Sequence, residues 1–147
     1  MGWVSPTAFS DPSAHWVNEP NIYDGSLATR CTGNTRVAYS WSDYLELTLA
    51  AINSDNARLY PRYTTARKWE VDVYKDDAWV NVHSGDYGSL VANNWNEFPF
   101  TQGTVSKVRI RWQHNAVSDI SCDLYEFEFW EVELPPPAGR SFGYIIG

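Results

Sequence analysis

Several stretches of this chain alternate apolar and polar residues with a period of two. In Tyr44–Leu49 the three leucines fall on one face, and in Lys68–Tyr74 the residues Trp69, Val71 and Val73 do the same. The pattern recurs in residues 79–83, 107–112 and 124–132. Because successive side chains of a strand point to opposite faces, this alternation is typical of antiparallel sheets with one buried and one wet face. The sequence therefore predicts an all-β fold, an antiparallel β-sandwich whose two apolar faces pack together.

The segments between these strands carry turn and loop signals. Lys75–Ala78 separates two alternating runs and is interpreted as a hairpin turn. Residues 84–94 and 113–121 are richer in Gly, Ser, Asn and Asp, which predicts loops. No segment keeps an apolar period of 3.6 residues over several turns, and the nearest helix candidate, residues 48–54, is short.

Charged residues fall on the expected wet faces of the strands. In the last strand Tyr125, Phe127 and Phe129 share one face, and the other face carries Glu126 and Glu128. Solvated face charges are the favoured interpretation of these glutamates. One strand also carries three basic residues on a single face, and they are expected to pair with carboxylates on neighbouring strands: Lys107, Arg109 and Arg111.

Composition narrows the function classes. The formal net charge of −7 disfavours nucleic-acid partners, because phosphate contacts need clustered Lys and Arg. The apolar runs are too short for a transmembrane helix, so membrane insertion is not expected. The first residues lack the basic and apolar regions of a secretory signal, and the location stays open, with a virion or a cell surface among the alternatives.

The 147 residues suit one domain with a full core. We expect that domain to span residues 1–134, because Pro135–Pro137 stops the last strand. Residues 135–147 are expected to form a Pro-led C-terminal arm, which is rich in aromatic and apolar side chains after Pro137. The arm either folds back onto the sandwich or docks on a neighbouring subunit, for example by adding a strand to an exposed edge.

The two cysteines, Cys31 and Cys122, leave two alternatives open. They could form one disulfide that closes a long loop, or they could be reduced core thiols. The lack of a visible secretory signal slightly favours free thiols.

The order of the motifs resembles the discoidin, or F5/8 type C, family of galactose-binding-like jelly rolls, which includes many carbohydrate-binding modules. The loop Asn21–Thr29 is similar to the family's Asp-Gly…Thr loop, and the strand Tyr44–Leu49 follows it as in the family. Trp69–Trp79 is similar to the central hairpin. The last two long strands are matched by Val105–Trp112 and Leu124–Trp130. The resemblance implies a discoidin-like jelly roll over residues 15–132.

The resemblance also implies a structural calcium ion. In many family members the Asp-Gly loop and a Glu of the last strand hold it, and the matching residues here are Asp24, Thr29 and Glu126. Calcium takes about six to eight oxygen ligands, so main-chain carbonyls near Tyr23 and Ser26 would have to contribute. The alternative is an Asp-Gly turn whose carboxylate accepts hydrogen bonds from nearby amides.

In this family the ligand surface lies on loops at one end of the sandwich. An exposed aromatic ring stacks on the sugar there, and planar hydrogen-bonding groups contact its hydroxyls. The matching candidates are Trp95, His83, Tyr87, Arg62 and Tyr63. For each of them the alternative is an ordinary packing role, since a Trp in a small sandwich is usually part of the core.

Two functions follow from these observations. The first is a non-catalytic binding module with glycan as its ligand, because the sequence lacks the nucleophile, metal-protease and phosphate-loop motifs of enzymes. The second is a virion structural protein, such as a phage decoration, head-fibre or tail component. It would self-assemble into a homo-oligomer, with other protein subunits as partners, through its sandwich and C-terminal arm.

Overall fold

The computed structural model describes residues 1–35, 39–62, 66, 68–86, 88–114 and 120–134. The strands are β1 (Gly2–Val4), β2 (Ala8–Ser10), β3 (Trp16–Val17), β4 (Cys31–Thr35), β5 (Leu45–Pro61), β6 (Lys68–Lys75), β7 (Ala78–Asp86), β8 (Asn96–Gln113) and β9 (Ile120–Glu131). A 3-10 helix, η1 (Glu19–Tyr23), lies between β3 and β4. All strand pairs are antiparallel, which confirms the predicted fold class.

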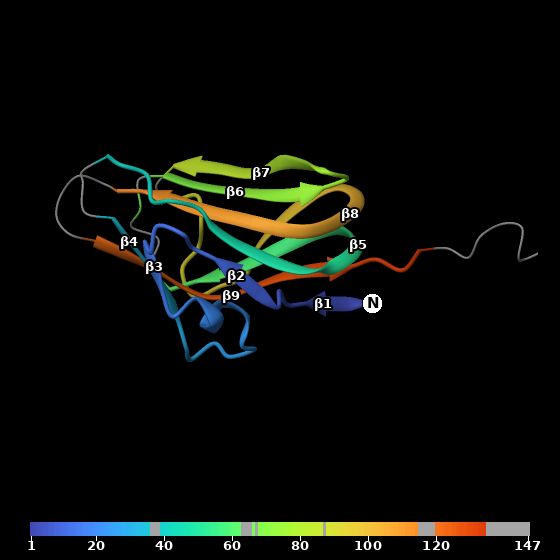
Figure 1. Ribbon diagram of the computed structural model, residues 1–147, viewed down its shortest axis with the longest axis horizontal. Coiled ribbons are helices and arrows are strands. Elements are labelled where there is room, and N and C mark those ends of the chain that lie inside the picture. Colours follow the sequence, from blue (N-terminus) through green and yellow to red (C-terminus); the bar gives the residue numbers. More distant parts are fainter. Residues whose placement is uncertain (36–38, 63–65, 67, 87, 115–119, 135–147) are drawn as a thin grey trace, which may run out of the picture.

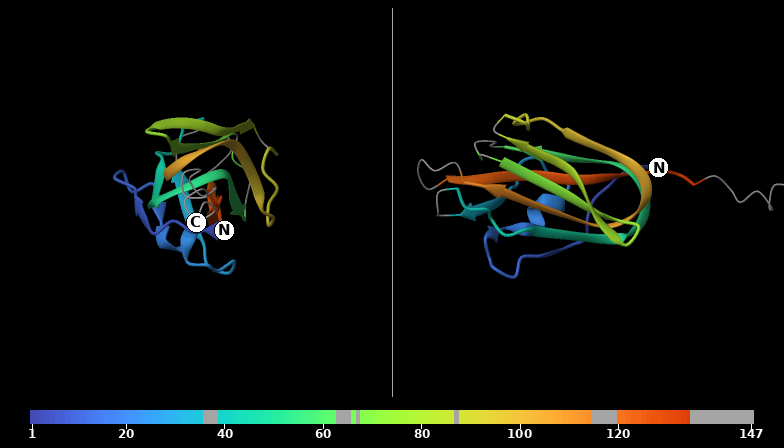
Figure 2. Two further views of the ribbon diagram at one scale, coloured as in Figure 1. Left: turned by 90° about the vertical axis from the view of Figure 1, so that its right-hand side faces the viewer. Right: turned by 90° about the horizontal axis from the view of Figure 1, so that it is seen from above.

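Two long strands, β5 and β8, bend over and run through both layers of the sandwich (Figures 1 and 2). The β6 layer contains β2, the first part of β5, the last part of β8, β6 and β7. The β9 layer contains the first part of β8, the last part of β5, and β9, to which β1 and β4 add. Register shifts in β5 between Thr48 and Ile52 and between Ser54 and Asn56 mark the bend. Such irregularities let a strand turn sharply without losing its partner.

The core lies between the two layers and is built from the predicted alternating positions. Trp69, Val71 and Val73 of β6 are at most 1% exposed. The leucines of the first part of β5 are buried too, and β8 and β9 contribute Val108, Ile110, Trp112, Phe127 and Phe129. On β4, Gly33 lets two indoles approach closely. A Cβ there would lie 2.7 Å from Nε1 of Trp112 and 2.8 Å from Cζ3 of Trp16.

The hairpin predicted at Lys75–Ala78 is confirmed. Lys75 pairs with Ala78, which leaves Asp76 and Asp77 as a two-residue turn with φ of 50° and 66°. Positive φ at both central residues defines the turn type that matches the twist of a hairpin. The Asp76 carboxylate also accepts a hydrogen bond from the Thr104 N–H at 2.9 Å, which ties the turn to the bend of β8.

The strand boundaries differ from the prediction in three places. β7 continues to Asp86 into the predicted loop, and residues 113 and 120–121 belong to strands. The short helix candidate, residues 48–54, is part of β5. In each case a bend or bulge interrupts the two-residue alternation of apolar and polar side chains, while the strand stays hydrogen-bonded to its neighbour.

The prediction of a solvated Glu126 is wrong. The register of β9 shifts opposite Tyr60 and Pro61, so Tyr125 leaves the core face that Phe127 and Phe129 keep. Glu126 is only 3% exposed. The carboxylate is buried because the loop after η1 covers it, and the N–H groups of Gly25 and Ser26 donate hydrogen bonds to its Oε1.

The free-thiol alternative is the one found. Cys31 and Cys122 lie on the neighbouring strands β4 and β9, both are buried, and no disulfide joins them. Burial raises the pKa of both thiols, which keeps them protonated and unreactive. The predicted C-terminal arm lies outside the described residues.

Candidate functional site

The loop after η1 encloses the Glu126 carboxylate. The N–H groups of Gly25 and Ser26 donate hydrogen bonds to Glu126 Oε1 at 2.8 and 3.2 Å. The Ser26 N–H also bonds Asp24 Oδ1 at 2.9 Å, and the Thr29 hydroxyl donates to Asp24 Oδ2. Gly25 has a φ of 79°, a conformation that suits glycine and lets the chain fold back toward β9. The structure thus brings together the three residues predicted to hold calcium.

The two carboxyl groups of this loop have opposite pKa shifts. Burial, and after it the hydrogen bond with the Asp24 carboxyl, raise the pKa of Glu126 to about 8. Burial also acts to raise the pKa of Asp24, but hydrogen bonds from Thr29 and Ser26 outweigh it and lower the pKa. The pair therefore carries one proton at neutral pH, as expected for two carboxyl groups that share a site.

This donor set fits a hard cation. Asp24, Thr29 and Glu126 all offer side-chain oxygens, which calcium prefers, and a cation beside them would relieve the carboxyl–carboxyl interaction. The side chains of these residues alone offer too few oxygen atoms to complete the coordination of a calcium ion. Among the described residues no group of three or more His, Cys, Asp or Glu could hold a metal ion. Main-chain carbonyls of the loop would have to complete the coordination.

The described members of the predicted ligand set lie on or next to strands: His83 on β7, Arg62 directly after β5 and Trp95 directly before β8. β6 begins and β7 ends at the left in Figure 1. The Asn93 N–H donates to the Pro61 carbonyl at 2.7 Å, which brings the segment before Trp95 beside the end of β5 and Arg62. Arg62 Nη1 lies 3.9 Å from Asp123 Oδ2. Tyr63 and Tyr87 lie outside the described residues.

His83 and Trp95 both make packing contacts. The His83 ring lies 5.1 Å from the Phe98 ring, and its Nε2 is 3.1 Å from the Ser89 hydroxyl. Burial lowers the pKa of His83. The Trp95 ring is partly buried, with the Arg58 guanidinium 3.8 Å from its centroid and Tyr60 edge-on at 5.3 Å. One face of this indole is therefore covered by protein, and its role toward a ligand stays a prediction.

A hollow that the sequence did not indicate lies on the outer face of the β6 layer. We call it the Trp41 hollow, and it has a volume of about 170 Å³. Its lining residues are Trp41, Lys68, Trp69, Glu70, Ser84, Gly85 and Asp86. Trp41 precedes β5 in a segment without alternation, so no period-two signal could have singled it out.

Arginines and aromatic rings alternate along the outer face of the β6 layer. The Arg111 guanidinium lies 4.3 Å from the Trp41 ring and 4.6 Å from the Tyr44 ring. The Arg109 guanidinium lies 4.4 Å from Tyr44 and 4.3 Å from Trp79. The predicted pairing of the basic trio is confirmed by three ion pairs, Arg111–Glu70 at 2.7 Å, Arg109–Asp72 at 2.8 Å and Lys107–Glu46 at 3.4 Å.

Together these layers form a discoidin-like, galactose-binding-like jelly roll, the class of fold that the motif order predicted. The chain is similar to a family 32 carbohydrate-binding module of AlyQ, solved with 4,5-unsaturated mannuronic acid. That structure has 21% identity and a TM-score of 0.66, with 90% of this chain and 100% of that one covered. No family model and no curated protein matches the sequence.

Two further solved structures share the fold. Chitosan-binding module 1 of a chitosanase/glucanase from Paenibacillus sp. IK-5 has 19% identity and a TM-score of 0.61, with 86% of this chain and 95% of that one covered. A pectin-binding carbohydrate-binding module has 18% identity and a TM-score of 0.61, with 92% and 96% covered. At this level of identity the comparisons establish the fold.

Proposed function

We propose that this protein is a non-catalytic glycan-binding module. The observation that carries the proposal is the extent of the structural match. Almost the whole of this chain aligns with almost the whole of modules whose names state that they bind carbohydrate. A fold can host many functions, so the proposal also needs a surface suited to sugar. The Trp41 hollow supplies an aromatic ring beside the hydrogen-bonding groups of Lys68, Glu70 and Asp86, the combination that sugar sites use.

The carboxyl pair of Asp24 and Glu126 supports a structural rather than a catalytic role for that site. Glycoside hydrolysis needs two carboxyl groups about 5–9.5 Å apart across a cleft that admits the substrate. Glu126 is instead 3% exposed and bonded to the amides of Gly25 and Ser26. We propose that the loop of residues 24–29, the Asp24 loop, holds a calcium ion together with Glu126, and that the ion fixes this loop against β9. When bound, the ion would supply charge neutralisation and coordination to these oxygens.

Binding to an array of immobilised glycans tests the proposed function, followed by calorimetric titration with soluble oligosaccharides. We expect saturable binding to at least one glycan class and no release of reducing ends during long incubation. An array without any signal above that of the heat-unfolded protein would overturn the proposal. Reducing ends released in proportion to protein concentration would overturn its non-catalytic part.

The virion-component alternative has no observation in its favour. The C-terminal arm that motivated it lies outside the described residues. Within the part of the chain that the structure describes, no helix has the length and apolar character to cross a membrane.

A further inference from the structure

We infer that the Trp41 hollow is the sugar-binding site of this protein and that it holds a neutral sugar unit. The inference rests on the proposed function and names the surface and the ligand class that would carry it. Four chain segments lie side by side there, because Trp41 pairs with Gln113, Gln113 with Lys68, and Lys68 with Asp86. At the usual spacing of neighbouring strands, Trp41 and Asp86 are about 14 Å apart across the sheet.

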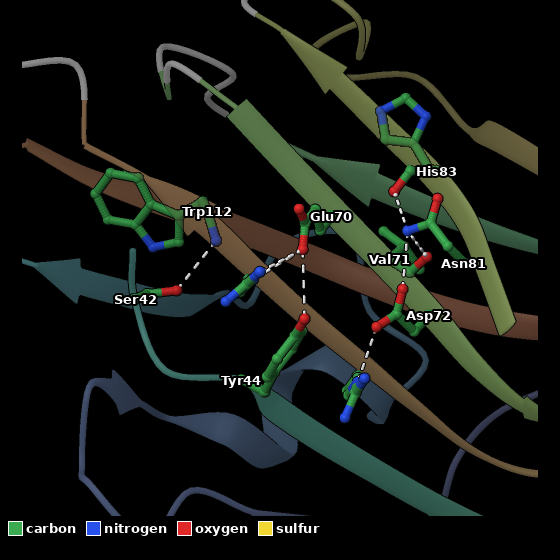
Figure 3. Close-up of polar contacts among 10 residues, drawn as sticks. Ser42, Tyr44, Glu70, Val71, Asp72, Asn81, His83 and Trp112 are labelled. Carbon is green, nitrogen blue, oxygen red and sulfur yellow. Dashed lines mark hydrogen bonds and ion pairs between the residues drawn. The ribbon is translucent and has the colours of Figure 1, made fainter. Parts of the chain in front are cut away.

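The aromatic wall of the hollow is held in place before any ligand arrives. Ser42 and Trp112 exchange two hydrogen bonds. Ser42 N donates to the Trp112 carbonyl at 2.8 Å, and Trp112 N donates to the Ser42 hydroxyl at 3.0 Å (Figure 3). These bonds fix the residue next to Trp41 against β8. The Arg111 guanidinium then covers part of the Trp41 ring. A wall fixed in this way loses little conformational freedom on binding, which favours affinity.

The floor of the hollow is equally ordered. The Glu70 carboxylate accepts hydrogen bonds from Arg111 Nε at 2.9 Å and from the Tyr44 hydroxyl at 3.3 Å (Figure 3). Arg111 Nη2 lies 2.7 Å from the same carboxylate oxygen, Oε2. Glu70 therefore presents a fixed acceptor, and one oxygen of its carboxylate carries all three of these contacts.

Lys68 and Asp86 differ from the other charges of this face. Their side chains have no ion pair or hydrogen bond with any residue that the structure describes. Both residues line the hollow, and they are directly opposed on β6 and β7. A ligand that offers both hydroxyl donors and acceptors would satisfy the ammonium and the carboxylate together.

The charges around the hollow favour a ligand without net charge. Lys68 and Asp86 of the lining carry opposite charges, and the third charged lining residue, Glu70, is ion-paired with Arg111 beside the hollow, so these four charges cancel. A uronate polymer would also meet the chain's net charge of −7, which repels polyanions at long range. A neutral pyranose avoids this repulsion, needs no net charge in the hollow, and can lay its apolar face on Trp41.

The test is a calorimetric titration of five variants and the wild type. The probes are neutral hexasaccharides of galactose, glucose and mannose, together with oligomers of alginate, pectin and chitosan. Salt is kept at about 150 mM, where the Debye length is only about 8 Å. The hollow is altered in Trp41→Ala, Lys68→Met and Asp86→Asn. Trp79→Ala is the matched control, because Trp79 lies on the same face over Arg109 but does not line the hollow. Trp95→Ala tests the other predicted aromatic.

We expect a neutral oligosaccharide to bind best. Trp41→Ala should weaken its binding about tenfold or more, as for a central aromatic contact. Lys68→Met and Asp86→Asn should each weaken binding of this oligosaccharide about three- to tenfold, because each removes a hydrogen bond between a charged side chain and the sugar. Trp79→Ala should stay within about twofold of the wild type, and thermal unfolding should show that every variant is folded.

Three outcomes would contradict the inference in different ways. Full affinity of Trp41→Ala with loss in Trp95→Ala would overturn the site and leave the proposed function intact. Tighter binding of the alginate, pectin or chitosan oligomers than of all neutral ones would overturn the ligand class. Absence of binding to every probe by the folded wild type would overturn the proposed function, and the inference would fall with it.

Discussion

The guanidinium of Arg58 stacks on the indole of Trp95, with its central carbon 3.8 Å from the ring centroid. The same carbon lies 3.9 Å from the centroid of the Trp3 ring, and Arg58 Nη2 donates to Glu128 Oε1 at 3.0 Å. One cation thereby ties β1 and the segment before β8 to β5 and β9. Stacked and ion-paired arginines of this kind depend on the planar guanidinium, which lysine cannot replace.

Arg58→Ala should lower the free energy of unfolding by about 2–3 kcal/mol, because it leaves Glu128 unpaired and removes the stack on two indoles. Urea denaturation measures the change. Arg30→Ala is the control, since the Arg30 side chain is 50% exposed and lies 3.6 Å from its partner Asp123. That variant should lose less than about 1 kcal/mol. Equal losses in the two variants would contradict the structural role of the stack.

Calcium should stabilise the wild type and should not stabilise Glu126→Gln. At a concentration about 100 times its dissociation constant, a ligand adds about 2.7 kcal/mol to the free energy of unfolding. For a domain of this size that shift corresponds to a rise in Tm of about 8 °C. Differential scanning calorimetry with calcium or with EDTA measures it. Glu128→Gln is the matched control and should keep the response, because Glu128 pairs with Arg58 instead of the Asp24 loop.

Calcium binding near pH 7 should also release about one proton, because a coordinating carboxyl must ionise. The Glu126 pKa of about 8 places that proton on the metal-free protein. Folding raises this pKa, so the contribution of Glu126 to metal-free stability is full below the unfolded pKa and is lost as pH rises toward 8. An unchanged calcium response in Glu126→Gln would remove Glu126 from the site.

His83 should make the protein less stable as pH falls through about 6.5, the ordinary pKa of histidine. Burial lowers the pKa of folded His83, so the unfolded chain takes up the proton first and the free energy of unfolding falls. The measurement is urea unfolding at a series of pH values in a Glu126→Gln background. This background removes the contribution of Glu126, which makes the protein more stable as pH falls. Adding His83→Gln should flatten the profile. The same slope with and without His83 would assign the effect to other groups.

Asp77→Gly should stabilise the hairpin by about 0.5–1 kcal/mol, because glycine adopts positive φ without the Cβ strain of other residues. Asp77 has a φ of 66°. Asp76→Gly is the contrasting variant, since it removes the hydrogen bond from Thr104 N to the Asp76 carboxylate at 2.9 Å. That loss should cancel or exceed the gain in backbone freedom. Thermal unfolding would contradict this account if both substitutions raised Tm equally.

The sandwich could be predicted from the sequence wherever strands stay straight. Leu45, Leu47, Val71 and Ile110 alternate with polar neighbours, and all four are buried. The second part of β5 and the first part of β8 were not predicted. The bend after Thr48 shifts the register there and breaks the period on which the prediction depends.

The candidate sites divide in the same way. The Asp24 loop could be predicted because its residues lie close together in the sequence and its partner Glu126 has a fixed place in the family resemblance. The Trp41 hollow could not. Its lining comes from β6, β7 and a segment before β5, and only the cross-strand register of Trp41, Lys68 and Asp86 brings them together. Register between distant strands leaves no local pattern in a sequence.

The position of β1 makes the amino terminus a suitable point for fusing or immobilising the protein. β1 and the chain's first residue lie at one end of the sandwich, and the ends of β6 and β7 that border the Trp41 hollow lie at the other (Figure 1). A carrier, bead or fluorescent fusion joined ahead of Met1 would therefore sit at the end of the sandwich away from the hollow and would leave the hollow uncovered. Oriented immobilisation through the amino terminus should present every copy to a surface-bound or polymeric glycan in the same productive direction.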